Sequence, residues 1–419
     1  MYRKPIRLVN VYLIFTLIAY VFTYMESNPH NMVLTVLICG VYFAFMTLGY
    51  YSIGLSVSNI NEEQKRFGYS KTIRNILVFA SAATIIVSFV NVFTFYSSTE
   101  MVLDYLANPG AAYEYVKFVR RNNISDSGMI TISSSLLGIS LNTLSFTKYI
   151  VFIFIPLFWK EISKSIRVLG IASILIYILQ SFLIGAMINV AIIVFSLLPI
   201  LIFMGGRIRN NVRATSGPVI FLFSLLLIAA IFFVIFFMGT RYVSADSGIG
   251  EILFAGISGL GVYISHGYVG LSTCFDISYV PTFGASTFRG LASTFLPKEV
   301  YDSLWVSSYL MRNQSNTGWP ALQKWSTIFP WLASDISFFL IPLVMLFMGR
   351  FMARVWKNAI ADKNPYAFLL MSQLMIFAFM IPANNQLFHS YGNAVGTIII
   401  YFMYRLSVSK KRFHFKFNL

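Results

Sequence analysis

Charged residues are scarce in this chain of 419 residues: only 11% are Asp, Glu, Lys or Arg, whereas 57% are hydrophobic. A soluble domain carries about 25% charged residues, so this composition excludes an ordinary water-soluble protein. The 41 Phe and 24 Tyr residues suit lipid-facing surfaces and the aromatic belts of a membrane interface. We predict an all-α polytopic membrane protein.

Cysteine and the motifs of soluble enzymes are also nearly absent. The two cysteines, Cys39 and Cys274, provide neither a disulfide framework nor a metal site. The sequence has no GxxxxGKS or GxxxxGKT loop, no HExxH and no GxSxG. The histidines expected outside the membrane, His30, His266 and His389, are scattered and lack an ExxH pattern. We therefore predict no catalytic metal and no cofactor.

Ten apolar stretches are long enough, or nearly so, to cross a bilayer, whose hydrocarbon core of about 30 Å takes about 20 helical residues. No repeat or linker divides the chain, so we predict about ten transmembrane helices in a single membrane domain, 1–419. The predicted spans are 7–25, 32–54, 76–95, 140–159, 168–184, 188–204, 219–238, 336–353, 367–381 and 393–404.

Basic residues give the chain a formal net charge of +16, and they are concentrated in alternate connections between these spans. One side has 22 basic and four acidic residues, whereas the other has eight basic and eleven acidic ones. The positive-inside rule makes the first side cytoplasmic, with both termini on it. The net charge thus reflects topology in a lipid bilayer, and we predict no nucleic acid partner.

Two loops on the extracytoplasmic side are longer than turns. In the first, 96–129, a Pro-Gly turn separates two helices, and the second helix, from Ala111, has Arg120 and Arg121 on one face. The second is 239–335. Its apolar run 252–265 is nearly long enough for an eleventh span, but its many glycines and the charge rule favour an interfacial or re-entrant helix.

Arginines on the extracytoplasmic side are candidate ligands for phosphate or pyrophosphate, which a guanidinium binds bidentately. Arg241 follows a predicted span by three residues and is expected at headgroup depth. The alternative is an interfacial anchor or a partner for Asp246. Four further arginines are predicted on the extracytoplasmic side: Arg120 and Arg121 in the first loop, and Arg289 and Arg312 in the second.

Two other ionisable residues have unusual predicted positions. Lys148 falls inside a span, about 18 Å along the helix from Lys160, so it either snorkels outward or faces a lipid-phosphate pocket. His266 follows the apolar run of the second loop. It either accepts a proton from an attacking hydroxyl or is hydrogen-bonded at the interface. His389 is a second candidate for that role.

Amide and tryptophan side chains near these residues are of the types that hydrogen-bond to sugars and stack on them. Asn385 lies in the polar stretch that includes His389, and Trp325 lies in the second loop. Interfacial belts are equally rich in Trp, so a structural role for Trp325 stays open.

Four short motifs in a fixed order carry a family resemblance: FMGTRYVS, YISHGYVGLS, VPTFGAST and KWSTIFPWLASDISF, the last leading into a span. With the ten-span layout and one dominant outer loop, the chain resembles the Wzy-type O-antigen polymerases. The resemblance implies an architecture similar to lipid-linked glycosyltransferases of the C superfamily. It implies that Arg241 and His266 are catalytic, and Tyr242 and Asp335 from the same motifs join the substrate-binding candidates.

The resemblance also implies the activity. Undecaprenyl-pyrophosphate-linked oligosaccharide repeat units would be joined on the periplasmic face of the bacterial inner membrane, alongside a chain-length regulator and a flippase. A hydroxyl of the acceptor would displace the pyrophosphate from the donor's anomeric carbon, with arginines stabilising the charge on the leaving group. The alternatives are an O-antigen ligase and a lipid-linked oligosaccharide flippase or transporter.

Overall fold

The structure is a computed structural model of the whole chain. It describes residues 4–25, 29–54, 67–96, 98–107, 109–122, 136–184, 188–209, 225, 228, 232, 234–236, 238–240, 242–243, 247–321 and 326–416.

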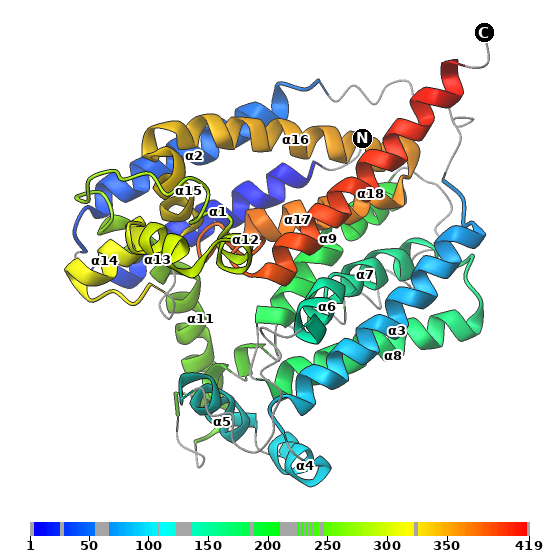
Figure 1. The fold of residues 1–419 in the computed structure, drawn as a ribbon, viewed down its shortest axis with the longest axis horizontal. Coiled ribbons are helices and arrows are strands. Elements are labelled where there is room, and N and C mark those ends of the chain that lie inside the picture. The colour runs from blue at the N-terminus through cyan, green and yellow to red at the C-terminus, as the bar shows by residue number, and fades with distance from the viewer. Residues whose placement is uncertain are drawn as a thin grey trace. The chain divides into compact units, whose positions relative to one another are not determined.

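Every secondary-structure element in this described part is a helix (Figure 1). Eight helical segments are long and apolar enough to cross a membrane, as an all-α polytopic membrane protein requires. The helices are α1 Pro5–Tyr24, α2 Met32–Tyr51, α3 Lys71–Phe93, α4 Thr99–Ala107, α5 Pro109–Asn122, α6 Leu136–Leu144, α7 Thr147–Leu157, α8 Lys164–Leu183, α9 Ile188–Arg209, α11 Ile249–Ser272, α12 Arg289–Phe295, α13 Lys298–Val306, α14 Tyr309–Thr317, α15 Ile328–Ile336, the 3₁₀ helix η1 Phe338–Leu340, α16 Ile341–Asp362, α17 Pro365–Met380 and α18 Tyr391–Lys416.

Seven of the ten predicted spans coincide with these candidate membrane helices. The predicted span 219–238 lies largely outside the described residues. The span 367–381 corresponds to α17, which is apolar but only 16 residues long. The span 393–404 lies within α18, which is 26 residues long and ends in a basic segment.

Helix α11 differs from our expectation for the second loop. The run 252–265 belongs to one continuous helix of 24 residues that is long and apolar enough to cross a membrane. Its glycines do not interrupt it, because two of them form close contacts with neighbouring backbone: Gly256 with Ile235, and Gly267 with Pro382. Length and composition do not fix how a helix lies in the bilayer, so its interfacial or re-entrant placement stays a prediction.

The chain divides into two compact units. Unit 1 consists of Met1–Arg66, Ile202–Arg213 and Ile257–Leu419, and unit 2 consists of Phe67–Leu201 and Ala214–Gly256. The prediction of a single membrane domain stays a prediction.

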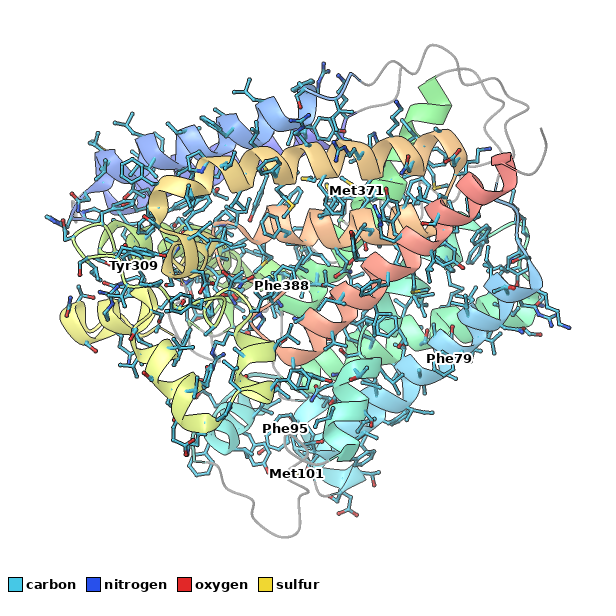
Figure 2. All side chains as sticks on the ribbon, turned by 45° about the horizontal axis from the view of Figure 1, so that its top comes forward. Phe79, Phe95, Met101, Tyr309, Met371 and Phe388 are labelled. Atoms are coloured by element: carbon cyan, nitrogen blue, oxygen red, sulfur yellow. The ribbon has the colours of Figure 1, made fainter. Side chains whose placement is uncertain are left out.

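In unit 1, α17 is the central helix, and all but one of its residues are buried. It packs against α16, α18 and α1. Met371, labelled in Figure 2, is fully buried on it. Two glycines bring α2 and α16 together, since a Cβ atom at Gly49 would lie 2.0 Å from the Leu346 carbonyl oxygen, and one at Gly349 would lie 1.9 Å from that of Met46.

In unit 2, α3 packs against α7 and α8. The first loop forms two helices, α4 and α5, as expected. The second begins at Pro109, two residues before the predicted start, because the fixed φ of proline suits the first turn of a helix. Tyr96 anchors this region: its hydroxyl donates to the Leu183 carbonyl, and its ring lies 5.8 Å from that of Tyr115.

Candidate functional site

Asp335 organises one part of the second loop in unit 1. It lies in the last turn of α15, and its carboxylate accepts hydrogen bonds from the Thr282 hydroxyl, the Gly284 N–H at 2.7 Å and the Thr287 N–H at 2.8 Å. Gly284 has φ +90°, a conformation that favours glycine. Because both carboxylate oxygens bind the segment 282–287, the geometry gives Asp335 a positioning role rather than direct contact with substrate.

The segment held by Asp335 in turn holds Asn385. The Asn385 Nδ2 donates to the Thr287 carbonyl oxygen at 2.6 Å. Asn385 follows α17 in a turn, 381–387, that is polar in its middle and yet buried throughout. The side-chain oxygens of Asn385 and Gln386 are buried, and neither has a hydrogen-bond partner within the described residues. A buried amide oxygen without a partner costs free energy, so these two atoms can accept hydrogen bonds from a ligand.

His389 lies in the next turn of the same segment. Its Nδ1 is 3.0 Å from the Asn385 carbonyl oxygen and 3.2 Å from that of Gln386. Carbonyl oxygens only accept hydrogen bonds, so Nδ1 carries the proton of the neutral ring and Nε2 carries the lone pair. Burial lowers the pKa of His389 most, and the positive charge of Arg289 lowers it further, while the hydrogen bonds to the Asn385 and Gln386 carbonyls raise it without reversing the net decrease. His389 is therefore a neutral base near pH 7.

Arg289 is the first residue of α12, and its position is fixed on two sides. Its Nε donates to the Tyr301 hydroxyl at 3.2 Å, and its guanidinium lies 4.9 Å from the centre of the Trp305 ring. Among the residues that the structure describes, no carboxylate lies within 4.0 Å of this guanidinium. The remaining N–H groups of Arg289 can therefore bind an anionic ligand.

A close contact between α12 and the start of α18 places Arg289 near His389. The Gly290 N–H donates to the Phe388 carbonyl oxygen at 3.0 Å, and a Cβ atom at Gly290 would lie 2.1 Å from the backbone of Ser390. The Phe288 and Phe388 rings lie 5.1 Å apart on the same junction, and Figure 2 labels Phe388. Any larger residue than glycine at 290 would separate the two segments.

We call Arg289, Trp305, Asn385, Gln386 and His389 the Arg289–His389 cluster. It combines a cation without a carboxylate partner among the described residues, a neutral base, two amides and an aromatic ring. Such a set can bind a phosphate, hydrogen-bond to a sugar and accept a proton from a hydroxyl, while the buried Trp305 ring packs against the Arg289 guanidinium.

Arg312 makes structural contacts within unit 1, and its predicted contact with substrate stays a prediction. Its Nε donates to the Ser307 carbonyl oxygen at 2.9 Å, and its Nη2 donates to that of Ser278 at 2.7 Å. The guanidinium also lies 5.3 Å from the centre of the Tyr309 ring. These contacts tie α14 to the segment near residue 278, so Arg312 is mainly a structural residue.

His266 stays a candidate base on α11. Its Nδ1 is 3.1 Å from the Val262 carbonyl oxygen, which again places the proton of the neutral ring on Nδ1. The next residue, Gly267, packs against Pro382, and its carbonyl oxygen accepts the Thr327 N–H at 3.1 Å. This contact brings the His266–Gly267 turn of α11 to the beginning of the polar segment that contains Asn385.

The other predicted site residues lie outside the described part or in unit 2. Arg241 and Trp325 are outside the described residues, and Arg120 and Arg121 lie on α5 with side chains outside them. Tyr242 is 61% exposed.

Lys148 lies on α7 of unit 2, and its ammonium group is close to two aromatic rings. The Nζ atom is 4.9 Å from the centre of the Tyr177 ring and 5.2 Å from that of Tyr149. These cation–π contacts favour an inward-facing lysine over one that snorkels to the interface.

Two aromatic residues that contact Arg289, Trp305 of the cluster and Tyr301 next to it, were not among the sequence candidates. They lie one helix beyond Arg289, and no periodic pattern links the two helices. The described residues contain no group of three or more His, Cys, Asp or Glu side chains that could hold a metal ion.

The chain matches no family model, no curated protein and no solved structure.

Proposed function

We propose that this protein is a membrane glycosyltransferase that polymerises oligosaccharide repeat units carried on a lipid pyrophosphate. The supporting observation is Arg289, whose guanidinium lacks a carboxylate partner among the described residues and lies near the neutral base His389. An enzyme that works outside the cytoplasm cannot draw on nucleotide-activated sugars. Its donor has to carry its own leaving group, and a pyrophosphate is one that an arginine recognises.

In the proposed reaction, an acceptor hydroxyl attacks the anomeric carbon of the donor sugar. The new carbon–oxygen bond forms as the bond from that carbon to the pyrophosphate oxygen breaks. His389 Nε2 takes the proton of the hydroxyl, and Arg289 stabilises the negative charge that develops on the leaving pyrophosphate. The Asn385 and Gln386 oxygens accept hydrogen bonds from sugar hydroxyls.

His266 and Arg241 remain part of the proposal. His266 is the alternative base, and Arg241 is a second ligand for the pyrophosphate. The distribution of basic residues supports an extracytoplasmic site in a bacterial inner membrane, with both termini cytoplasmic. A chain-length regulator and a flippase would be its partners.

A polymerase-null strain expressing Arg289→Gln tests this proposal. We expect single repeat units on the lipid A core instead of a ladder, because removing one charge-stabilising donor lowers the rate by about 10²–10³-fold. The matched control is Lys298→Gln, which removes an exposed positive charge from the same loop and should leave the ladder intact. A full ladder from Arg289→Gln at normal protein level would refute the role of Arg289. Polymer retained on the lipid pyrophosphate would indicate a ligase instead.

A further inference from the structure

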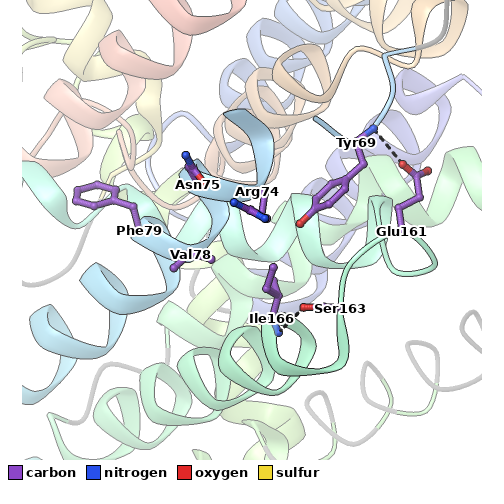
Figure 3. A pocket seen from close by; sticks show the side chains of 8 residues that line it. All are labelled: Tyr69, Arg74, Asn75, Val78, Phe79, Glu161, Ser163 and Ile166. Atoms are coloured by element: carbon purple, nitrogen blue, oxygen red, sulfur yellow. Dashed lines mark hydrogen bonds between the residues drawn. The ribbon is translucent and has the colours of Figure 1, made fainter. Parts of the chain in front are cut away.

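Unit 2 contains a cavity of about 710 Å³ where α3 and α8 begin (Figure 3). Both helices start with a serine cap: Ser70 accepts the Ile73 N–H at 3.2 Å, and Ser163 accepts the Ile166 N–H at 3.5 Å. The cavity therefore lies at two helix N-termini, where partial positive charge favours an anion. Its volume is in the range of about 300–1,000 Å³ that small-molecule sites occupy.

One end of the cavity is polar. Figure 3 shows the Arg74 guanidinium pointing toward the Tyr69 hydroxyl. The Tyr69 hydroxyl is inaccessible to solvent and has no hydrogen-bond partner within the described part of the chain. No described carboxylate lies within 4.0 Å of Arg74. This end thus offers one cation and one buried hydroxyl to a ligand.

The other end of the cavity is apolar and opens to the surface. Val78 and Phe79, about one turn further along α3, are 38% and 58% exposed. Helix α3 is long and apolar enough to cross a membrane, and an exposed apolar wall on such a helix suits contact with acyl chains. Ile166 on α8 adds a further apolar side chain.

The charge around the cavity is positive on balance. The first turns of α3 and α8 contain Lys71, Arg74, Lys164 and Arg167. The single carboxylate that lines the cavity belongs to Glu161, and its Oε2 accepts the Tyr69 N–H at 3.0 Å. A negatively charged ligand in the cavity therefore meets Arg74 and one carboxylate that is already hydrogen-bonded, and the other three cations lie in the same helical turns without lining the cavity.

We propose that this cavity binds an anionic phospholipid, independently of the proposed polymerase function. The phosphate group lies between Arg74 and the Tyr69 hydroxyl, and an acyl chain follows Val78 and Phe79 into the bilayer. A free phosphate would use the polar end alone and would leave the apolar wall without a role. The helix ends concerned lie on the side predicted to be cytoplasmic, where anionic lipids are concentrated.

Native mass spectrometry of the purified full-length protein in detergent tests the proposal. Phosphatidylglycerol and phosphatidylcholine are added at equal concentration, and the apparent Kd of each is measured. We expect phosphatidylglycerol to bind more tightly, and Arg74→Ala to weaken its binding by about fivefold, since one basic side chain near an anionic lipid contributes about that factor. Phe79→Ser should also weaken it. The control Arg354→Ala, which removes an exposed arginine of α16 in unit 1, should not.

Three results would overturn the proposal. One is equal retention of the two lipids by the wild-type protein, which needs no variant to fold. The second is unchanged binding of phosphatidylglycerol by Arg74→Ala. The third is displacement of the lipid by inorganic phosphate with the same affinity in wild type and Phe79→Ser, which would indicate a small-anion site. Because lipid retention is the readout, none of these results bears on polymerisation.

Discussion

Arg289 has no carboxylate partner among the described residues, and its positive charge contributes to the lowered pKa of His389. A positive charge next to a histidine disfavours the protonated imidazole, and burial acts in the same direction. The Asn385 and Gln386 carbonyls then fix the tautomer through Nδ1. The residues around His389 thus favour a neutral base with Nε2 available, which is the form that can accept a proton from a sugar hydroxyl.

The proposed polymerisation should depend on pH in a way that follows from the lowered pKa of His389. A base acts when unprotonated, so activity is lost as pH falls through the pKa of the folded protein. Because that pKa is lowered, we expect a flat rate from pH 8 to about 6.5, the ordinary histidine value, and a decline only below it. Initial rates of polymerisation in proteoliposomes across this range check the prediction. A decline that begins well above pH 6.5 would contradict it.

Arg289→Gln should change that profile as well as the rate. Removing the guanidinium removes the smaller of the two causes that lower the pKa of His389, so that pKa should rise toward its ordinary value. The residual activity should then decline at a higher pH than in the wild type. Lys298→Gln provides the control profile. An unshifted acid limb in Arg289→Gln, measured at matched protein level, would show that the two side chains are not coupled.

Asp335 is expected to affect stability more than chemistry. In Asp335→Asn one carboxylate oxygen becomes an NH₂ group, so at least one of the donors from Thr282, Gly284 and Thr287 loses its acceptor. This should cost about 1–3 kcal/mol and lower the melting temperature in detergent. Asp302→Asn, an exposed carboxylate on α13, is the control, with an expected change within about 0.5 kcal/mol. Equal melting temperatures for the two variants would contradict the positioning role.

At the scale of helices, glycine contacts hold the cluster together. A Cβ atom at Gly267 would lie 2.0 Å from the Pro382 carbonyl oxygen, whereas one at Gly261 on the same helix would meet nothing within 4 Å. The two glycines of α11 therefore have opposite predicted responses to alanine.

Gly267→Ala should destabilise the protein by about 1–3 kcal/mol, because the added methyl group forces the backbone apart. Gly261→Ala should instead stabilise it by about 0.5–1 kcal/mol, since alanine has the higher helix propensity. Thermal unfolding of both variants in the same detergent makes the comparison. Destabilisation of equal size in both would show that α11 does not pack closely at Gly267.

The sequence predicted the helices better than the site, for a physical reason. Hydropathy is a local property, so α1, α2 and α3 follow from runs of apolar residues. The approach of Arg289 to His389 depends on contacts between segments about a hundred residues apart, and the Gly290 contact that produces it has no local signal.

The roles of individual arginines also depend on contacts between distant segments, which the sequence does not reveal. Arg289 and Arg312 looked equivalent as outer cations. Only the positions of the Ser278 and Ser307 carbonyls separate the structural arginine from the one that can bind a ligand.

At the scale of the whole chain, two hydrogen bonds each join segments that the charge distribution predicts to lie on the same side. The Tyr69 N–H donates to Glu161, which joins two connections that the positive-inside rule makes cytoplasmic. In unit 1, Asn31 donates to Asp276 at 3.1 Å, which joins two predicted extracytoplasmic segments. The alternation of sides itself stays a prediction.

Cysteine labelling in spheroplasts tests whether α11 crosses the membrane. Gly248→Cys and Lys298→Cys introduce exposed thiols before and after this helix, and the native Cys39 and Cys274 are buried. An interfacial or re-entrant α11 leaves both new thiols outside, so a membrane-impermeant maleimide should label both.

The control Lys357→Cys, on the side predicted to be cytoplasmic, should be labelled only after lysis. Labelling of only one of the two outer thiols in intact spheroplasts would show that α11 spans the bilayer and would reverse the predicted side of one of its flanking segments.

The most direct test of the central claim is polymerisation by the purified protein. A lipid-pyrophosphate-linked repeat unit is supplied without nucleotide in proteoliposomes, and products are separated by size. The proposal predicts a ladder of polymers and release of the lipid pyrophosphate from the wild type and from Lys298→Gln, and single repeat units from Arg289→Gln. Active wild-type preparations that leave the repeat unit unchanged, or that only move it across the bilayer, would contradict the proposal.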